Sequence, residues 1–539
     1  TYLTDSFLTG VGTMIQTYAG SFAYDDTQDD IMDGAPRVIV FSGDTPQAPS
    51  VENGLLPTQV TMSTGSGSAA YSQRNFSWYT GRNVEQGTLQ ILPYVSQTPD
   101  FAGGQTINIA AESVPVVKGK TRLNLALIAK FGTQDVTRHT AVVTGLNANS
   151  RYWYRVGNPE ANAWSEPQIF RTGPAEGGFN FNVVADSQGM CAADYVVYHD
   201  TMDNAARRFR TAAFTVHLGD IVDNGMDEDQ WTMATSGKAV RSTPVIPVTG
   251  NHEVKGDVSA VTEPNALLRH YNLQGMNVPP QDSSQGIYYS YRYQNALFVV
   301  LNSESLDELN GLDATQMDWA YEELSNTDAE WKIVLLHKST YSSGPHRNDR
   351  DVVRIRTQLN ALAADTGVAL VLGGHDHTYN RTDVLRRGTV RATSTENRSH
   401  RGVVYPMLTN PAGTIFITPG TVGVKYYPVA IDNSIPTLKS EQPELPVYAN
   451  IEIEGNSLYY QAFTVNNGTA TAYDRIGLQR VTVEDIPAWQ PVIEAIDALP
   501  AAIQLRHAAE VEAARAAYNA LSTAEQAEVS NYDRLLAAE

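Results

Sequence analysis

The sequence has little of several residue types, and each shortage excludes a class of protein. Cys191 is the single cysteine among 539 residues, so the chain cannot form an internal disulfide. No run approaches the roughly 20 uncharged apolar residues that a membrane-spanning helix needs. Basic residues are also few: 38 Lys and Arg against 59 Asp and Glu give a formal charge of −21. Because non-specific binding to nucleic acid needs a basic surface, we expect no nucleic-acid partner.

The charge is unevenly distributed along the chain. Residues 338–402 hold eleven Lys or Arg and six Asp or Glu, so this window carries +5 and the remainder −26. A basic region on an acidic protein favours an anionic ligand, and several negative charges on that ligand would suit it best.

The length predicts about three domains. Short runs of β-branched and aromatic residues between Gly, Asn and Ser turns predict an antiparallel β-sandwich over residues 36–175. Its segment LNANSRYWYRV resembles the tyrosine corner of fibronectin-type sandwiches. The sandwich has no cluster of catalytic residue types, so we expect it to pack against or position another domain. Residues 1–35 contain a candidate amphipathic helix, residues 5–18, and an acidic stretch, and indicate no function.

Apolar runs that alternate with helical stretches predict an α/β domain over residues 176–480. Residues 485–539 are rich in alanine and predict a small helical bundle. An apolar helical face and the capping box of the next helix support this prediction: Val511, Ala514, Tyr518 and Leu521, then Ser522 with Glu525. This bundle resembles helical modules repeated in surface proteins of Gram-positive bacteria. The resemblance implies a secreted or cell-surface protein with cell-wall association, and we expect a mature or trimmed chain because no signal-peptide pattern opens it.

Five strand-like runs of the α/β domain end in residues that can bind metal. They are FNFNVVAD at Asp186, FTVHLGD at Asp220, PVIPVTGNH at Asn251 and His252, WKIVLLH at His337, and ALVLGGHDH at His375 and His377. Because strand ends in α/β sheets share one edge, we expect these side chains to converge on one cleft. Gly219, Gly250 and Gly374 would allow the sharp turns that bring them there. Oxygen and imidazole donors favour Zn, Mn or Fe, and their number suits two metals that share a carboxylate.

The ordered motifs D-x-x, GDIVDNG, GNHE, LLHK and GHDHTYNR, preceded by the sandwich, resemble the calcineurin-like metallophosphoesterases and specifically the purple acid phosphatases. The resemblance covers about residues 36–475. It implies two β-sheets flanked by helices, a dinuclear metal centre at one edge and no organic cofactor. It implies one metal bound by Asp186, Asp220 and His377, and a second bound by Asp220, Asn251, His337 and His375.

Two positions depart from the family pattern. Asp223 stands where the purple enzymes have a tyrosinate that binds ferric iron. Gln188 stands where they have glycine and where non-purple relatives have a histidine ligand. We therefore expect two divalent or mixed ions of Fe, Zn or Mn. Gln188 is either a further ligand of the first metal or a turn residue, whereas Asp223, like Glu253, is expected to hydrogen-bond around the ligands.

The resemblance implies hydrolysis of phosphate esters by a metal-bound hydroxide. His252 is the candidate general acid or transition-state stabiliser, with orientation of Asn251 as its alternative role, and His346 is a second candidate acid. Candidate substrate-binding residues, unless they are solvated surface groups, are Asn251, His252, Lys338, Arg347, Arg350, Tyr379 and Arg381.

Three functions remain open at this point. The leading hypothesis is hydrolysis of phosphate monoesters on a small phosphorylated substrate, an inositol phosphate being attractive because the family includes phytases. The second is a phosphodiesterase or nucleotidase with the same metals. The third is a cell-surface binding protein in which the helical tail is the functional part.

Overall fold

The computed structural model describes residues 54–122, 130–255, 262, 265–307, 311–391, 393–430, 435–481, 488–500, 503 and 507–539. Of the first 53 residues it describes only the antiparallel strands β1 (Ile15–Thr17) and β2 (Val38–Val40). β1 lies inside the candidate amphipathic helix, so that prediction is wrong at these residues. The rest of the helix, like most of the 1–35 segment, lies outside the described residues.

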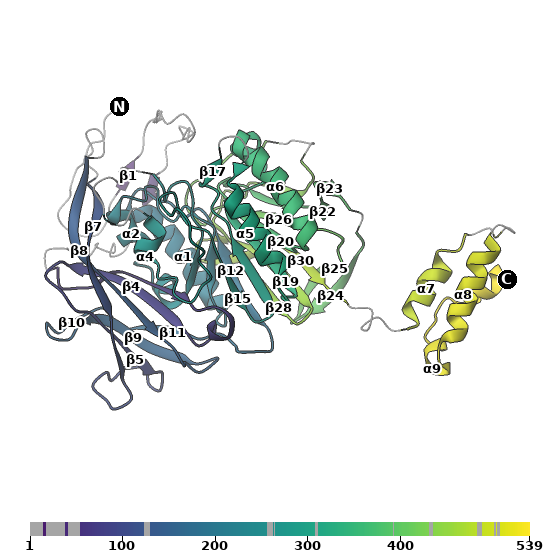
Figure 1. The fold of residues 1–539 in the computed structure, drawn as a ribbon, viewed down its shortest axis with the longest axis horizontal. Coiled ribbons are helices and arrows are strands. Elements are labelled where there is room, and N and C mark those ends of the chain that lie inside the picture. The colour runs from purple at the N-terminus through teal and green to yellow at the C-terminus, as the bar shows by residue number, and fades with distance from the viewer. Residues whose placement is uncertain are drawn as a thin grey trace.

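The first domain is the predicted β-sandwich (Figure 1). One antiparallel sheet has the order β3 (Thr58–Thr64), β4 (Arg74–Gly81), β8 (Lys130–Val143), β7 (Glu112–Arg122). The other has the order β10 (Ala163–Trp164), β9 (Arg151–Asn158), β5 (Thr88–Pro93), β6 (Ile107–Ala110), with β11 (Gln168–Arg171) also paired to β9. In the LNANSRYWYRV segment, the Tyr152 hydroxyl accepts a hydrogen bond from the backbone N–H of Asn147 at 2.9 Å.

The second domain contains two sheets that face each other. The first sheet has the order β14 (Val245–Pro247), β13 (Thr215–His217), β12 (Phe179–Val184), β28 (Val447–Glu454), β29 (Ser457–Asn466), β30 (Thr469–Gln479), β25 (Val403–Thr409), β24 (Thr395–His400). The second has the order β15 (Tyr289–Tyr293), β16 (Ala296–Val300), β19 (Trp331–Lys338), β20 (Leu370–Gly374), β26 (Ile415–Pro419), β21 (Tyr379–Thr382), β27 (Thr437–Glu441). β12, β13 and β14 are parallel, as are β16, β19, β20 and β26, so each set presents its carboxyl ends at one edge.

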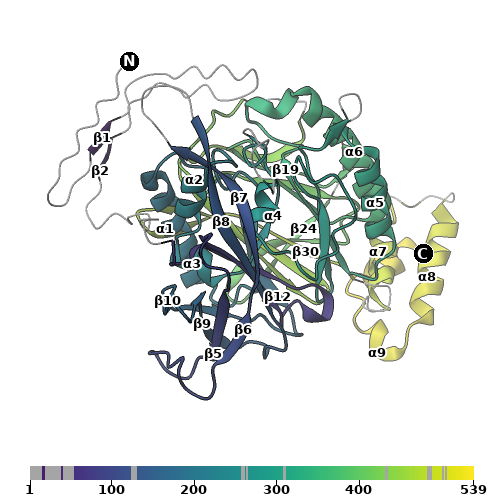
Figure 2. The same ribbon diagram turned by 60° about the vertical axis from the view of Figure 1, so that its left-hand side comes forward.

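Helices cover the outer faces of these sheets (Figures 1 and 2). They are α1 (Ala192–Arg208), α2 (Glu228–Ala234), α3 (Lys238–Ser242) and α4 (Ala266–His270), and on the second sheet α5 (Ala314–Ser325) and α6 (Arg350–Thr366). Short elements complete the domain: the two-stranded ribbons β17 (Leu306–Asp307) with β18 (Gly311–Leu312) and β22 (Leu385–Arg386) with β23 (Thr389–Val390), and the 3-10 turn η3 (Pro345–Asn348). Another 3-10 turn, η2 (Gly67–Ala69), connects β3 and β4 of the sandwich.

Strand β19 explains why the ligand-bearing strands read as continuous apolar runs. Ile333 and Leu335 belong to the core between the two sheets, whereas Val334 and Leu336 belong to the core beneath α5 and α6. Successive side chains of a strand point to opposite faces, so a strand covered on both faces has no polar alternation. In β19 the polar side chains lie near its two ends: Lys332 at one, and His337 and Lys338 at the other, where the cleft begins.

The C-terminal residues form the helices α7 (Gln490–Asp497), α8 (Ala508–Ala520), α9 (Thr523–Gln526) and α10 (Tyr532–Ala538), which share one apolar cluster. Val511 and Ala514 are buried in this cluster, and the predicted capping box of Ser522 and Glu525 is present at α9. Among the described residues, no helix is long and apolar enough to cross a membrane.

Candidate metal centre

The carboxyl ends of the parallel strands bring the predicted ligands into two groups. Asp186 follows β12, Asp220 follows β13 and His375 directly follows β20, and all three have a positive φ: 56°, 54° and 70°. Left-handed backbone is rare for residues other than glycine, and it concentrates at functional sites where the surrounding structure enforces it. Here it turns each side chain away from its strand and into the cleft.

Glycines allow this close convergence, as the sequence predicts. A Cβ atom on Gly250 would lie 2.2 Å from Asp220 Oδ1, and one on Gly219 would lie 2.9 Å from the Gly250 Cα. A Cβ atom on Gly374 would lie 2.9 Å from Asp186 Oδ2. Any larger residue at these three positions would displace a predicted ligand or the backbone beside it.

The first group consists of Asp186, Asp220 and His377, and one ligand atom from each lies within 4.8 Å of the others. All three side chains are buried. The Nδ1–H of His377 donates to the backbone carbonyl of Lys425 at 2.9 Å, which leaves the Nε2 lone pair for the cleft. Nε2 is buried without a hydrogen-bond partner, as a metal-binding nitrogen would be before the metal enters.

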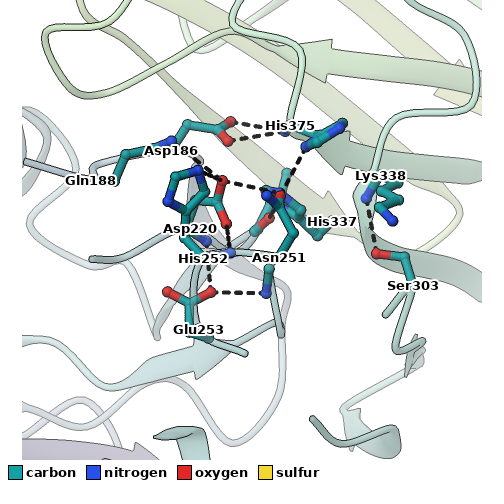
Figure 3. Close-up of polar contacts among 12 residues, drawn as sticks. Asp186, Gln188, Asp220, Asn251, His252, Glu253, Ser303, His337, Lys338 and His375 are labelled. Atoms are coloured by element: carbon teal, nitrogen blue, oxygen red, sulfur yellow. Dashed lines mark hydrogen bonds and ion pairs between the residues drawn. The ribbon is translucent and has the colours of Figure 1, made fainter. Parts of the chain in front are cut away.

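The second group consists of Asp220, His337 and His375, so Asp220 belongs to both groups. Asn251 completes it: the Asn251 Oδ1 atom lies 3.0 Å from His337 Nε2 and 3.0 Å from His375 Nδ1. His337 donates its Nδ1–H to the Leu218 carbonyl at 2.8 Å and turns Nε2 toward the group. The structure therefore brings together the seven side chains predicted from the sequence, including Gln188, and all of them except His377 are labelled in Figure 3.

Gln188 has one satisfied and one unsatisfied side-chain atom. Its Nε2 donates to Asp220 Oδ2 at 3.3 Å, whereas Oε1 is buried and has no hydrogen-bond partner. A buried acceptor left without a partner costs free energy unless a cation or another donor occupies the space beside it. Together with His377 Nε2, this atom shows that the donor set fits metal ions that share Asp220.

Glu253 holds the backbone of the second motif in place. Its carboxylate accepts hydrogen bonds from the backbone N–H groups of Asp220 and Gly250, both at 2.8 Å, and of Ile221 at 2.7 Å. Burial and the neighbouring Asp220 carboxylate raise the pKa of Glu253 to about 8. Glu253 therefore lies around the ligands, in agreement with its predicted role.

His252 points its ring into the same cleft (Figure 3). Its Nδ1–H donates to the backbone carbonyl of Asp223 at 2.6 Å, and the Asp223 carboxylate lies 3.4 Å from the same nitrogen. Its Nε2 lies 3.8 Å from Asp220 Oδ2. Asp223 thus orients His252, and His252 is placed to act on a group bound next to Asp220.

His346 lies beside the second group. Its ring centre is 4.4 Å from that of His375, and its Nδ1 lies 2.9 Å from Asp349 Oδ2. This position agrees with a role as a general acid in the cleft, which stays a prediction.

Sequence reasoning missed Tyr427. Its ring stacks on that of His377 with 4.3 Å between the ring centres, and its centre lies 5.8 Å from that of His346. The tyrosine pair of TVGVKYY, just after a strand, was the available signal.

Three of the predicted substrate-binding side chains are engaged elsewhere. Tyr379 is fully buried and donates its hydroxyl to Asp474 at 2.8 Å, and Arg381 binds both oxygens of the same carboxylate, at 2.7 and 3.1 Å. Lys338 is paired with Asp351 at 2.7 Å and with Glu304 at 3.3 Å. The prediction is wrong for Tyr379, which has no exposed atom to offer, and the ion pairs count against Lys338 and Arg381.

The remaining predicted contacts stay predictions. Arg347 donates to the Gly344 carbonyl at 3.0 Å, and Arg350 is exposed at the start of α6. The basic window of residues 338–402 is therefore partly neutralised in the fold, because several of its cations have acidic partners outside the window, such as Glu304 and Asp474.

Comparison with known families agrees with this geometry. Residues 57–172 match the purple acid phosphatase N-terminal domain, and residues 179–379 match the calcineurin-like phosphoesterase domain. The chain therefore contains a calcineurin-like phosphoesterase domain and a purple acid phosphatase N-terminal domain. The two matches cover the sandwich and the strands that carry the metal ligands.

Similar proteins are purple acid phosphatases of low sequence identity. Fe(3+)-Zn(2+) purple acid phosphatase 12 of Arabidopsis thaliana is 22% identical, over 63% of this chain and 71% of that protein. Purple acid phosphatase 15 of the same plant is also 22% identical, and the chain spans about half of its length, 49%. A solved purple acid phosphatase from yellow lupin seeds superposes with a TM-score of 0.60 at 16% identity, over 84% of this chain and 78% of that one. This last likeness shows the shared fold.

The Gln188→Ala variant tests whether the amide is a ligand. It removes one donor from the first group and none from the second, so we expect it to weaken the first metal site by about tenfold and the second much less. Metal content measured by mass spectrometry after graded chelation would show one ion lost early. Loss of both ions at the same chelator concentration would make Gln188 a turn residue.

Metal binding should release protons. Burial lowers the pKa of His337, but Asp220 more than offsets this and raises it to about 10 in the metal-free protein. A histidine must be neutral to bind a metal, so loading at pH 7 must expel this proton, and affinity must increase as the pH rises toward 10. Calorimetric titration of zinc in buffers of different ionisation enthalpy measures the release; heats independent of the buffer would contradict it.

Proposed function

We propose that this protein hydrolyses phosphate monoesters at a dinuclear metal centre. The observation that carries the proposal is the pair of donor groups that share Asp220, buried at the meeting edge of two parallel strand sets. When bound, two metal ions supply Lewis acidity: they neutralise phosphate oxygens and lower the pKa of water. The activity of the whole protein is part of this proposal, because the chain spans only about half of the length, 49%, of purple acid phosphatase 15.

The protein's own residues supply positioning and a proton. Asn251 and the histidines around it fix the second donor group, and Glu253 fixes the backbone that carries Asp220. His252 holds its Nδ1–H on the Asp223 carbonyl, and its Nε2 lies 3.2 Å from Lys255 Nζ. In the protonated imidazolium form, Nε2 is the atom that donates a proton to a leaving oxygen. His346, oriented by Asp349, is the second candidate for this task.

The substrate we favour is a small phosphate ester. An inositol phosphate is the most highly charged candidate, but Lys338 and Arg381, the cations nearest in sequence to the ligands His337 and His377, are paired with carboxylates. Because these two cations are already neutralised, we favour a monoester with one phosphate group over a highly charged inositol phosphate.

The metals we propose are a divalent pair or a mixed pair of Fe, Zn or Mn. Asp223 replaces the tyrosinate expected for ferric iron, and its carboxylate lies 3.4 Å from His252 Nδ1. One relative carries Fe(3+)-Zn(2+) in its name, which supports a mixed pair as one alternative. An enzyme without the tyrosinate should lack the purple colour.

The proposed location is outside the cell or at its surface. This proposal rests on the resemblance of the C-terminal helices to modules of surface proteins. The two relatives described above come from Arabidopsis thaliana and give no support to a Gram-positive origin.

Steady-state assays on 4-nitrophenyl phosphate, its bis ester and phytate test the function. We expect the highest kcat/KM for the monoester, because the similar proteins are named acid phosphatases. Preference for the bis ester would make the protein a phosphodiesterase. A metal-loaded protein that hydrolyses none of the three would favour the surface-binding alternative and contradict the proposal.

Replacing His252 with alanine separates its two candidate roles. If His252 protonates the leaving oxygen, kcat should fall by about 10²–10⁴ for an alkyl phosphate and much less for 4-nitrophenyl phosphate, whose leaving group needs little protonation. Metal content should be unchanged, whereas the control Asn251→Ala should lose metal. Equal losses for both esters, or loss of metal from the His252 variant, would limit His252 to orienting its neighbours.

A further inference from the structure

A buried carboxylate lies at the junction of the sandwich and the second domain. Glu228, the first residue of α2, has a side chain only 3% exposed. Lys118 Nζ from β7 of the sandwich lies 3.3 Å from its Oε2 atom, and Arg269 Nη2 from α4 lies 3.6 Å from Oε1. Gln59 Nε2 from β3 donates to Oε2 at 3.1 Å, and His270 Nε2 lies 3.4 Å away. We call these five residues the Glu228 cluster.

The cluster is held together by charge. Burial alone would raise the pKa of Glu228, but Lys118, His270 and Arg269 together hold it below its ordinary value, so the carboxylate is ionised. Burial lowers the pKa of His270 to about 4, so at neutral pH the compensating charges are those of Lys118 and Arg269. A buried charge that loses its partner is strongly destabilised, so the geometry of the cluster depends on the sandwich lysine.

The sandwich also contacts α4 through its backbone. The Tyr79 hydroxyl donates to the carbonyl of Arg269, Thr61 donates to the carbonyl of His270, and Arg138 donates to that of Leu268 at 2.9 Å. The Lys118 ammonium lies 4.0 Å from the centre of the Tyr79 ring. The sandwich therefore fixes both the backbone and the charged end of α4.

A short chain of hydrogen bonds leads from the cluster to the metal centre. Arg269 Nη2 donates to the Gly225 carbonyl at 2.6 Å, and Trp231 Nε1 donates to the same oxygen at 3.1 Å. The N–H of Gly225 donates to the carbonyl of His252 at 2.8 Å. A Cβ atom on Gly225 would lie 2.0 Å from the Glu253 carbonyl, so the two backbones are in direct contact there.

We propose that Lys118 of the sandwich is a positioning residue for the metal centre: through Glu228 and Arg269 it fixes Gly225, and thereby the loop of residues 219–226 that carries Asp220 and orients His252. The effect on catalysis rests on the proposed function. The effect on the loop does not, because it concerns contacts within the protein alone. Lys118 and Gln59 thus give the sandwich a task in the reaction beyond packing.

Hydrogen exchange in the full-length protein tests the proposal without any substrate. In Lys118→Met, amides of residues 219–226 should exchange about tenfold faster, because a lost buried contact lowers the free energy of local opening. Lys118→Arg keeps the charge and should retain the protection. Gln59→Ala removes hydrogen bonds with Glu228, Thr232 and Lys118 but no charge. It should give a smaller change in the same loop and serves if Lys118→Met does not fold.

The matched control is Phe170→Leu, which weakens the sandwich core at a buried residue outside the cluster. It should lower the melting temperature without changing exchange in residues 219–226.

In kinetics, Lys118→Met should lower kcat by about tenfold with KM within twofold and metal content unchanged, as expected for a misplaced catalytic group. Exchange changes confined to residues 57–64 and 112–122, or equal changes in the control, would overturn the proposal. A wild-type protein without phosphatase activity would refute the proposed function and leave the exchange result decisive.

Discussion

The close approach of backbone at the ends of β13 and β14 is the constraint on which the site depends. Gly250 passes so near Asp220 that a Cβ atom there would overlap the carboxylate, and Asp220 itself adopts left-handed backbone with a φ of 54°. Glu253 stabilises this arrangement because its carboxylate accepts hydrogen bonds from three backbone N–H groups at the two strand ends. Because Asp220 is held in this way, its side chain can belong to both donor groups.

The same constraint connects the ligands to the fold around them. Parallel strands place their carboxyl ends at one edge, and two such edges meet where β12 and β13 face β19 and β20. Each histidine then needs a fixed orientation, which His377 takes from the Lys425 carbonyl and His337 from the Leu218 carbonyl. The metal centre is therefore specified by backbone atoms as much as by the side chains that bind metal.

The ligands could be predicted from the sequence because their positions follow a local rule. Asp186, Asp220 and His375 each follow a buried strand, and the carboxyl ends of parallel strands share one edge of a sheet. The sandwich and the α/β character of the second domain were predictable for a similar reason, since periodicity and turns are local signals, whereas its two sheets were implied only by the family resemblance. Strand β1 was not predicted, because its residues lie in a stretch that was interpreted as an amphipathic helix.

The contacts that prediction missed join residues far apart in the chain. Arg381 meets Asp474 93 positions later, and Gln59 meets Glu228 169 positions later. A basic residue next to a ligand motif resembles a phosphate-binding residue until its carboxylate partner is known, which is why Arg381 and Lys338 were misleading. The Glu228 cluster has no sequence signature at all, because its members come from two domains.

Anomalous scattering from a crystal, measured at the Fe, Zn and Mn edges, tests the central claim most directly. The account predicts two separate peaks, with Asp220 in contact with both, Asp186 and His377 beside one, and Asn251, His337 and His375 beside the other. One peak, or two peaks that do not share Asp220, would contradict the dinuclear centre.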